Sequence, residues 1–209
     1  MERQETGFGF EWGEGWRRTG DALVRGICHE LNGRLAVLSG LLELTTMDGA
    51  LDDETSRLMR EAVTRMESLV SLLRVVPPTE WSASEPVLLP DAVGAALSAL
   101  ECIPGLEDVQ TALEVEGDPP PVEAEWSPLV KMLVLVLHGA ASGGAARLVP
   151  RVAVSERGVT FSLALPDDRV AGGVAGAAEE AVEALDGVIE TAGGEVVVTL
   201  PVAVEALRG

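Results

Sequence analysis

The chain has 209 residues, enough for one or two domains with hydrophobic cores, and 47% of them are hydrophobic although only 3% are aromatic. Its formal net charge is −19, so its surface repels phosphate groups, and we expect neither nucleic acid nor an anionic membrane as a partner. We further expect a cytoplasmic protein, because no apolar run is long enough to cross a bilayer and the first residues lack the apolar stretch of a signal peptide.

Two long amphipathic helices are expected in the first third of the chain. Residues 1–18 are rich in glycine and tryptophan and lack periodicity, which predicts an irregular N-terminal tail. A helix is expected from about Thr19, which with Asp21 can cap the first turn, to Met47, before Asp48-Gly49. Its apolar stripe recurs every three or four residues, at Leu23, Ile27, Leu31, Leu35, Leu38 and Leu42. A second helix is expected from Asp52 to the Pro77-Pro78 pair, with a stripe at Leu58, Ala62, Met66, Leu69, Leu73 and Val76.

Residues 19–78 therefore predict a helical hairpin whose apolar stripes cannot cover each other completely. Two such hairpins would bury the stripes in a four-helix bundle, so we expect a homodimer. The alternative is that the C-terminal part of the same chain folds back over the hairpin.

His29 lies on the side of the first helix opposite the apolar stripe, about 175° from its centre at 100° per residue. An exposed imidazole with an open approach suits proton or phosphoryl exchange with another molecule. Two simpler interpretations stay open: His29 is an ordinary surface histidine, or the small residues around it permit a close contact between helices. These small residues, at spacings of three and four, are Gly26, Gly33, Ala36 and Gly40.

From residue 79 the pattern changes to short helices and strands. Helices are expected at 91–101, 127–140 and 177–185, and extended segments at 109–115, 122–125 and 187–200, the last with a turn at Gly193-Gly194. The alternating runs 148–155 and 159–165 predict a β-hairpin. Residues 79–209 are therefore expected to form an α+β domain, a mixed sheet with helices on one face.

The sequence predicts neither a metal site nor a cofactor. Cys28, His29, Cys102 and His138 lack the spacing of a zinc site, and both thiols are expected to be reduced. Residues 77–209 carry 21 acidic and 6 basic residues, and the one lysine of the chain is Lys131. A triphosphate site normally gathers cations or a metal ion around its oxygens, and this part of the chain is poor in cations.

The run from His29 to Leu35 resembles the phosphoacceptor box of sensor histidine kinases, His-Glu-Leu-x-x-Pro-Leu, on the first helix of a dimerisation and phosphotransfer hairpin. The match holds at His29, Glu30, Leu31 and Leu35. Arg34 stands where the family has proline, and Gly33 stands where it has threonine or asparagine, a position that supports phosphatase activity in many members.

The order of the C-terminal elements also resembles the ATP-binding domain of these kinases. In this resemblance Leu135 and Gly139 stand at the positions of the asparagines that bind metal and nucleotide. Residues 166–173 stand at the adenine-binding Asp-x-Gly-x-Gly turn without containing that motif, and the ATP lid that should follow is nearly absent. The resemblance covers about residues 20–201 and implies a phosphotransfer hairpin at 19–78 and a degenerate histidine-kinase ATPase-like domain at 79–209.

This combination is similar to dimeric histidine phosphotransferases, which relay phosphoryl groups between response-regulator receiver domains in two-component phosphorelays without autokinase activity. In that interpretation His29 carries the phosphoryl group, Glu30 orients or deprotonates the imidazole, and Arg25 contacts the phosphoryl oxygens. Two alternatives stay open: a non-catalytic pseudokinase or adaptor that sequesters a response regulator or kinase, and an active histidine kinase, which the missing nucleotide residues disfavour. The residues expected to contact a receiver are Gly26, Asn32, Gly33, Ala36 and Gly40.

Overall fold

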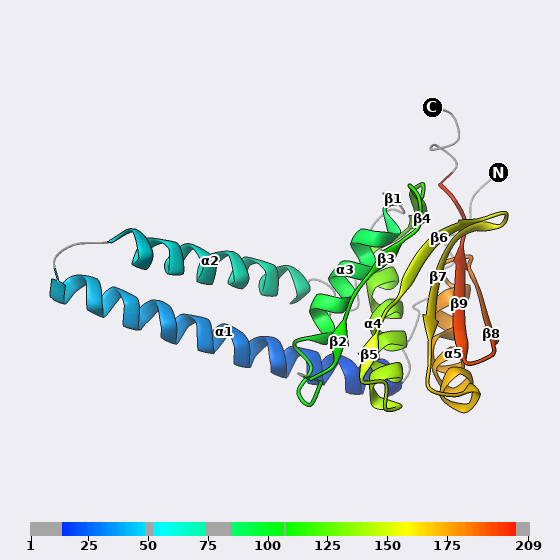
Figure 1. The fold of residues 1–209 in the computed structure, drawn as a ribbon, viewed down its shortest axis with the longest axis horizontal. Coiled ribbons are helices and arrows are strands. Elements are labelled where there is room, and N and C mark those ends of the chain that lie inside the picture. Colours follow the sequence, from blue (N-terminus) through cyan, green and yellow to red (C-terminus); the bar gives the residue numbers. More distant parts are fainter. Residues whose placement is uncertain (1–13, 49–51, 74–84, 107, 204–209) are drawn as a thin grey trace, which may run out of the picture.

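The computed structural model describes residues 14–48, 52–73, 85–106 and 108–203. It consists of a long helical hairpin that extends from a two-layer α/β domain (Figure 1). This architecture confirms the predicted fold class, an N-terminal helical hairpin followed by a C-terminal domain of mixed helix and sheet.

The hairpin is formed by α1 (Glu14–Asp48) and α2 (Asp53–Leu73), which run antiparallel (Figure 1). The acidic start predicted for α2 is confirmed: the Asp52 carboxylate accepts a hydrogen bond from the Thr55 N–H at 2.6 Å, and hydrogen bonding to Thr55 lowers the pKa of Asp52. On the exposed side Arg57 pairs with Glu54 and Glu61, an arrangement that supports a solvated helix. The predicted end of α2 at Pro77 lies outside the described residues.

The helix α1 begins at Glu14 rather than near Thr19, so the prediction of an irregular tail is wrong for residues 14–18, and residues 1–13 lie outside the described residues. The physical reason is packing. Trp16 is 6% exposed and belongs to the main core, where the ammonium group of the buried Lys131 lies 5.6 Å from the centre of its ring. A cation over an aromatic face is attracted by the negative face of the ring, and sequence periodicity gives no sign of so distant a partner.

Within the described residues, the helices of the α/β domain are α3 (Leu89–Leu100), α4 (Trp126–Ser142) and α5 (Asp168–Glu183). The main sheet has the strand order β3-β6-β7-β9-β8, with antiparallel neighbours except for the parallel pair β3–β6. Its strands are β3 (Glu114–Val115), β6 (Arg151–Ser155), β7 (Gly158–Ala164), β8 (Val188–Ala192) and β9 (Glu195–Leu200). Two further strand pairs are β1 (Glu85–Val87) with β4 (Val122–Ala124), antiparallel, and β2 (Gln110–Thr111) with β5 (Arg147–Leu148), parallel.

One face of the main sheet packs against the helices. In β7 the alternate residues Val159, Phe161 and Leu163 are buried, as the alternating sequence predicts. The predicted β-hairpin is confirmed by the antiparallel pairing of β6 with β7. The central helix α4 packs against both α3 and α5, which explains why its sequence is apolar on almost every side.

The helix α5 begins at Asp168, whereas the sequence predicts its start near Ala177. Its first turn is capped by Asp167, whose carboxylate accepts a hydrogen bond from the Val170 N–H at 2.8 Å. Glycines in this stretch have low helix propensity, but the burial of Ala171, Val174 and Ala178 outweighs it. Only residues 165–167 therefore connect β7 to α5.

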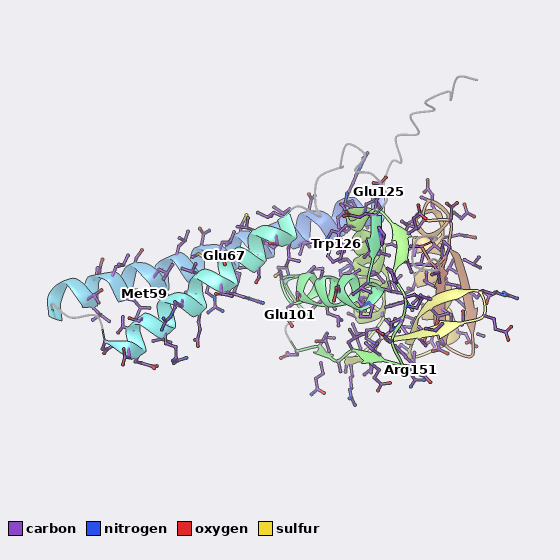
Figure 2. All side chains as sticks on the ribbon, turned by 90° about the horizontal axis from the view of Figure 1, so that it is seen from above. Met59, Glu67, Glu101, Glu125, Trp126 and Arg151 are labelled. Carbon is purple, nitrogen blue, oxygen red and sulfur yellow. The ribbon has the colours of Figure 1, made fainter. Side chains whose placement is uncertain are left out.

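The first part of α1 is built into the α/β domain, and the rest of the hairpin projects from it (Figures 1 and 2). Leu23 and Ile27 are fully buried in the same core as α4, whereas Leu35 and Leu42 are 52% and 57% exposed. The alternative in which the C-terminal part covers the hairpin therefore holds for the first turns of α1 and the last turns of α2, where Leu69 and Leu72 belong to the same core. The homodimer stays a prediction. No described helix combines the length and apolar character that a bilayer crossing requires.

Candidate functional site

His29 lies on the exposed surface of α1, close to the point where the hairpin leaves the α/β domain. It lines a hollow of about 440 Å³ between three elements. Arg25, His29 and Glu30 come from α1, Arg65 comes from α2, and Glu101 and Cys102 come from the turn after α3. Glu101 lies at the hairpin end of α3 (Figure 2). The structure thus places the predicted residues His29, Glu30 and Arg25 at one site. Arg25 and His29 are four residues apart and therefore neighbours on one side of α1.

The carboxylate of Glu30 pairs with Arg34 rather than with the imidazole. It accepts hydrogen bonds from Arg34 Nε at 2.9 Å and from a terminal guanidinium nitrogen at 2.7 Å. Within the described part of the chain, the imidazole of His29 makes no hydrogen bond or ion pair. The role of Glu30 as orienting group or base therefore stays a prediction, and Arg34 forms an ion pair with Glu30 on the surface of α1.

Gly26 does not belong to the exposed strip, so its predicted place there is wrong, whereas its part in partner binding stays a prediction. It is buried, and a Cβ at this position would overlap the carbonyl oxygen of Cys102 and lie 2.6 Å from the carbonyl carbon. The close-contact interpretation therefore holds here, because only a residue without a side chain lets α1 approach the turn after α3. A Cβ at Gly33 or Gly40 would meet no atom within 4 Å. The members of the strip that are exposed are Asn32, Gly33, Ala36 and Gly40.

Cys102 borders the hollow from the α/β domain, and its Sγ donates to the Ser98 carbonyl at 3.5 Å. Burial raises the pKa of the Cys102 thiol, the Arg65 cation opposes this effect, and the carboxylates of Glu30 and Glu101 add to it. The charged groups of the three elements are thus close enough to act on one atom. Within the described residues, no group of three or more His, Cys, Asp or Glu side chains is placed to hold a metal ion.

The two positions expected to have lost nucleotide ligands lie on α4, where it faces α5. Leu135 is half-buried against the main core. A Cβ at Gly139 would lie 3.0 Å from the side chain of Val174, and a Cβ at Gly143, one turn later, would lie 2.5 Å from the side chain of Val170. Side chains of α5 therefore occupy the space beside this part of α4.

Sequence reasoning missed Arg65 and Glu101. They are 36 residues apart, and a terminal nitrogen of the Arg65 guanidinium lies 3.4 Å from Glu101 Oε2. Arg65 could have been suspected as one of the few cations of the hairpin, but its position beside His29 depends on the packing of α2 against the α/β domain. Glu101 gave no signal beyond its place at the end of a predicted helix.

The fold and the site together define a class of architecture: a helical hairpin that exposes a histidine and shares part of its core with a two-layer α/β domain. No protein-family model matches the sequence, and no curated protein matches it. Solved structures with a similar fold include the histidine kinase AdeS of Acinetobacter baumannii, at 20% identity over 84% of this chain and 97% of that chain, with a TM-score of 0.43.

Two other solved structures are similar to this chain, one over most of its length and one over little more than half of it. One is a bacterial phosphotransferase, at 14% identity over 87% of this chain and 94% of that chain, with a TM-score of 0.42. The other is the ATP-binding domain of PrrB from Mycobacterium tuberculosis, at 18% identity over 58% of this chain and 99% of that chain, with a TM-score of 0.46.

Proposed function

We propose that the protein is a histidine phosphotransferase that relays phosphoryl groups between response-regulator receiver domains through His29, without ATP autokinase activity. The observation that carries the proposal is the exposure of His29, within a box that resembles a phosphoacceptor site, in a hollow that also contains Arg25 and Arg65. A solvent-accessible imidazole between cations suits the uptake of a dianionic group from another protein.

The transfer step needs only groups that His29 and the receiver supply. A ring nitrogen of the neutral imidazole attacks the phosphorus atom of the aspartyl phosphate, so that an N–P bond forms and the P–O bond to the acyl oxygen breaks. The aspartate leaves as a carboxylate with the electron pair of that bond. The imidazole, now carrying both its N–H proton and the phosphoryl group, becomes neutral at the ring when it releases the proton to water. Reversal of the step on a second receiver completes the relay.

The proposed absence of autokinase activity rests on α4 and α5. Leucine and glycine at positions 135 and 139 supply no side-chain ligand for a metal ion or a nucleotide. The connection of three residues between β7 and α5 leaves no length for a lid over a nucleotide. The contact of Val174 with α4 at Gly139 supports the same interpretation, because it fills the space with protein atoms.

Receiver docking and dimerisation belong to the same proposal. Asn32, Gly33, Ala36 and Gly40 form a low, exposed strip beyond His29, on which a helix of a receiver can lie. The exposed leucines Leu35 and Leu42 continue the apolar stripe away from the α/β domain, and a second hairpin would bury them. The proposed assembly is thus a homodimer with one docking strip on each hairpin.

A second candidate function is that of a pseudokinase, an adaptor that binds a receiver or a kinase without accepting phosphate. The observation that favours it is the altered box, in which arginine stands at the proline position and Arg34 forms an ion pair with Glu30. Both functions predict binding of a receiver, and only the phosphotransferase predicts a covalent phosphohistidine.

The deciding experiment is transfer from purified receiver domains that carry a radiolabelled aspartyl phosphate. The wild type should acquire label that is stable in alkali and lost in acid, as expected for a phosphohistidine, and His29→Ala should bind receivers without acquiring label. Gly33→Trp should block docking and leave the fold intact, because its side chain would project into open space. Binding without labelling of the wild type would establish the pseudokinase, and labelling of His29→Ala would place the acceptor elsewhere.

A further inference from the structure

Within the described residues, Arg65 is the one side chain of α2 that borders the His29 hollow, and its ion pair with Glu101 is weak. The contact between Arg65 and Glu101 is a single one at 3.4 Å between side chains that are 37% and 52% exposed. By comparison, Arg34 holds Glu30 through two nitrogens at 2.9 and 2.7 Å. An exposed ion pair with one long contact contributes little to stability and opens readily.

The charges at the hollow are suited to an incoming anion. Glu30 and Arg34 neutralise each other, which leaves Arg25 and Arg65 against the single carboxylate of Glu101. A phosphoryl group on His29 adds about two negative charges at neutral pH. Guanidinium groups bind such a group through two parallel hydrogen bonds, which are stronger than the one contact that Arg65 has with Glu101.

We propose that Arg65 is a phosphoryl-binding residue of the His29 site, held at rest by Glu101 and transferred to the phosphoryl oxygens when His29 is phosphorylated. This inference rests on the proposed function and adds a residue from α2 and one from the α/β domain to it. Glu101 is a positioning residue in this arrangement, because it keeps the guanidinium beside the imidazole before the phosphoryl group arrives.

The arrangement also gives the α/β domain a part in the phosphoryl site. The turn that carries Glu101 and Cys102 is fixed against α1 through the contact at Gly26, so its position relative to His29 is set within one chain. The domain thus supplies the resting partner of Arg65 although it has lost the side chains expected of a nucleotide site.

The test phosphorylates the full-length protein chemically, so that it does not depend on a receiver. Phosphoramidate transfers a phosphoryl group to accessible imidazoles, and ³¹P NMR follows the ionisation of the phosphohistidine as the pH is changed. His29→Ala serves as the blank that identifies any signal from His138. In the wild type the Arg65 guanidinium favours the dianion, so Arg65→Ala should raise the phosphoryl pKa by about 0.5 to 1. Glu101→Gln should lower it, because it releases the guanidinium and removes a negative charge.

Arg60→Ala is the matched control, because Arg60 is an exposed arginine of α2 that does not line the His29 hollow. It should leave the phosphoryl pKa unchanged. Transfer from a phosphorylated receiver should fall about tenfold in Arg65→Ala and not in Arg60→Ala. An unchanged titration in both Arg65→Ala and Glu101→Gln, or an equal change in Arg60→Ala, would overturn the proposal. If the titration moves as expected but no receiver transfers phosphate, the phosphoryl-binding role of Arg65 stands and the phosphotransferase function fails.

Discussion

Replacing Gly26 by alanine tests how α1 is fixed to the α/β domain. The added Cβ would overlap the Cys102 carbonyl oxygen and lie 2.6 Å from its carbon, whereas atoms of these kinds normally keep more than 3 Å apart. Both atoms belong to backbone, so α1 and the turn must separate, which loosens the packing of Leu23 and Ile27. Overpacking of this kind costs about 3 kcal/mol. The higher helix propensity of alanine returns about 1 kcal/mol. We therefore expect a net loss of about 2 kcal/mol.

The assay is thermal unfolding followed by circular dichroism at one protein concentration, because dimerisation would make the midpoint depend on concentration. For a chain of this length the expected loss corresponds to a fall of about 4–8 °C in the midpoint. Gly33→Ala and Gly40→Ala are matched controls in open space and should raise the midpoint slightly through helix propensity. A Gly26→Ala variant as stable as these controls would refute the close contact and with it the fixed wall of the His29 hollow.

Three further outcomes concern nucleotide, assembly and pH. Incubation with radiolabelled ATP and Mg²⁺ should leave the protein unlabelled, and calorimetry should detect no ATP binding. Self-labelling at the rate of a sensor kinase would contradict the proposed absence of autokinase activity. Leu35→Glu combined with Leu42→Glu should give a monomer in light scattering, because burying charge at the apolar stripe of a dimer is costly. Leu44 is exposed and lies off the stripe, so Leu44→Glu should remain dimeric. A dimeric double variant would refute the proposal that the stripe forms the dimer interface. Burial lowers the pKa of His138 below 6.5, so the unfolded chain binds a proton at this residue more readily than the folded chain. The unfolding midpoint should therefore decline as the pH falls below 6.5, and His138→Gln should weaken that decline. An identical decline in His138→Gln would show that other groups cause it.

The sequence was sufficient to predict elements with clear periodicity, but it did not predict the first residue of a helix where tertiary contacts determine it. The stripes of the hairpin and the alternation in β7 predicted their elements correctly, because the period of apolar residues differs between a helix and a strand. The start of α1 was missed because it depends on Trp16 packing near Lys131. The start of α5 was missed because its glycines oppose a helix that core packing stabilises.

The same division applies to the candidate site. His29 and Arg25 could be placed together from the sequence because both lie on one side of one helix. Gly26 was misplaced because a strip without side chains has the same pattern whether it faces solvent or a backbone carbonyl. One signal was present: Gly26 lies between Leu23 and Ile27, in the part of α1 that the structure buries. Arg65 could not be placed, since its distance from His29 is set by how α2 packs.

The fixed junction between α1 and the α/β domain bears on how a phosphoryl group can reach His29. An ATP-dependent kinase must bring a nucleotide held in one domain to a histidine in another, which requires the two parts to move relative to each other. Here Leu23 and Ile27 are fully buried in the core of the α/β domain, and exposing these two side chains alone would cost about 3–6 kcal/mol. The turn at Glu101 therefore stays beside His29, while the strip from Asn32 to Gly40 faces solvent. In the proposed function the phosphoryl group arrives on a separate receiver domain, so the relay needs no movement of the α/β domain against α1, and the buried junction is compatible with it.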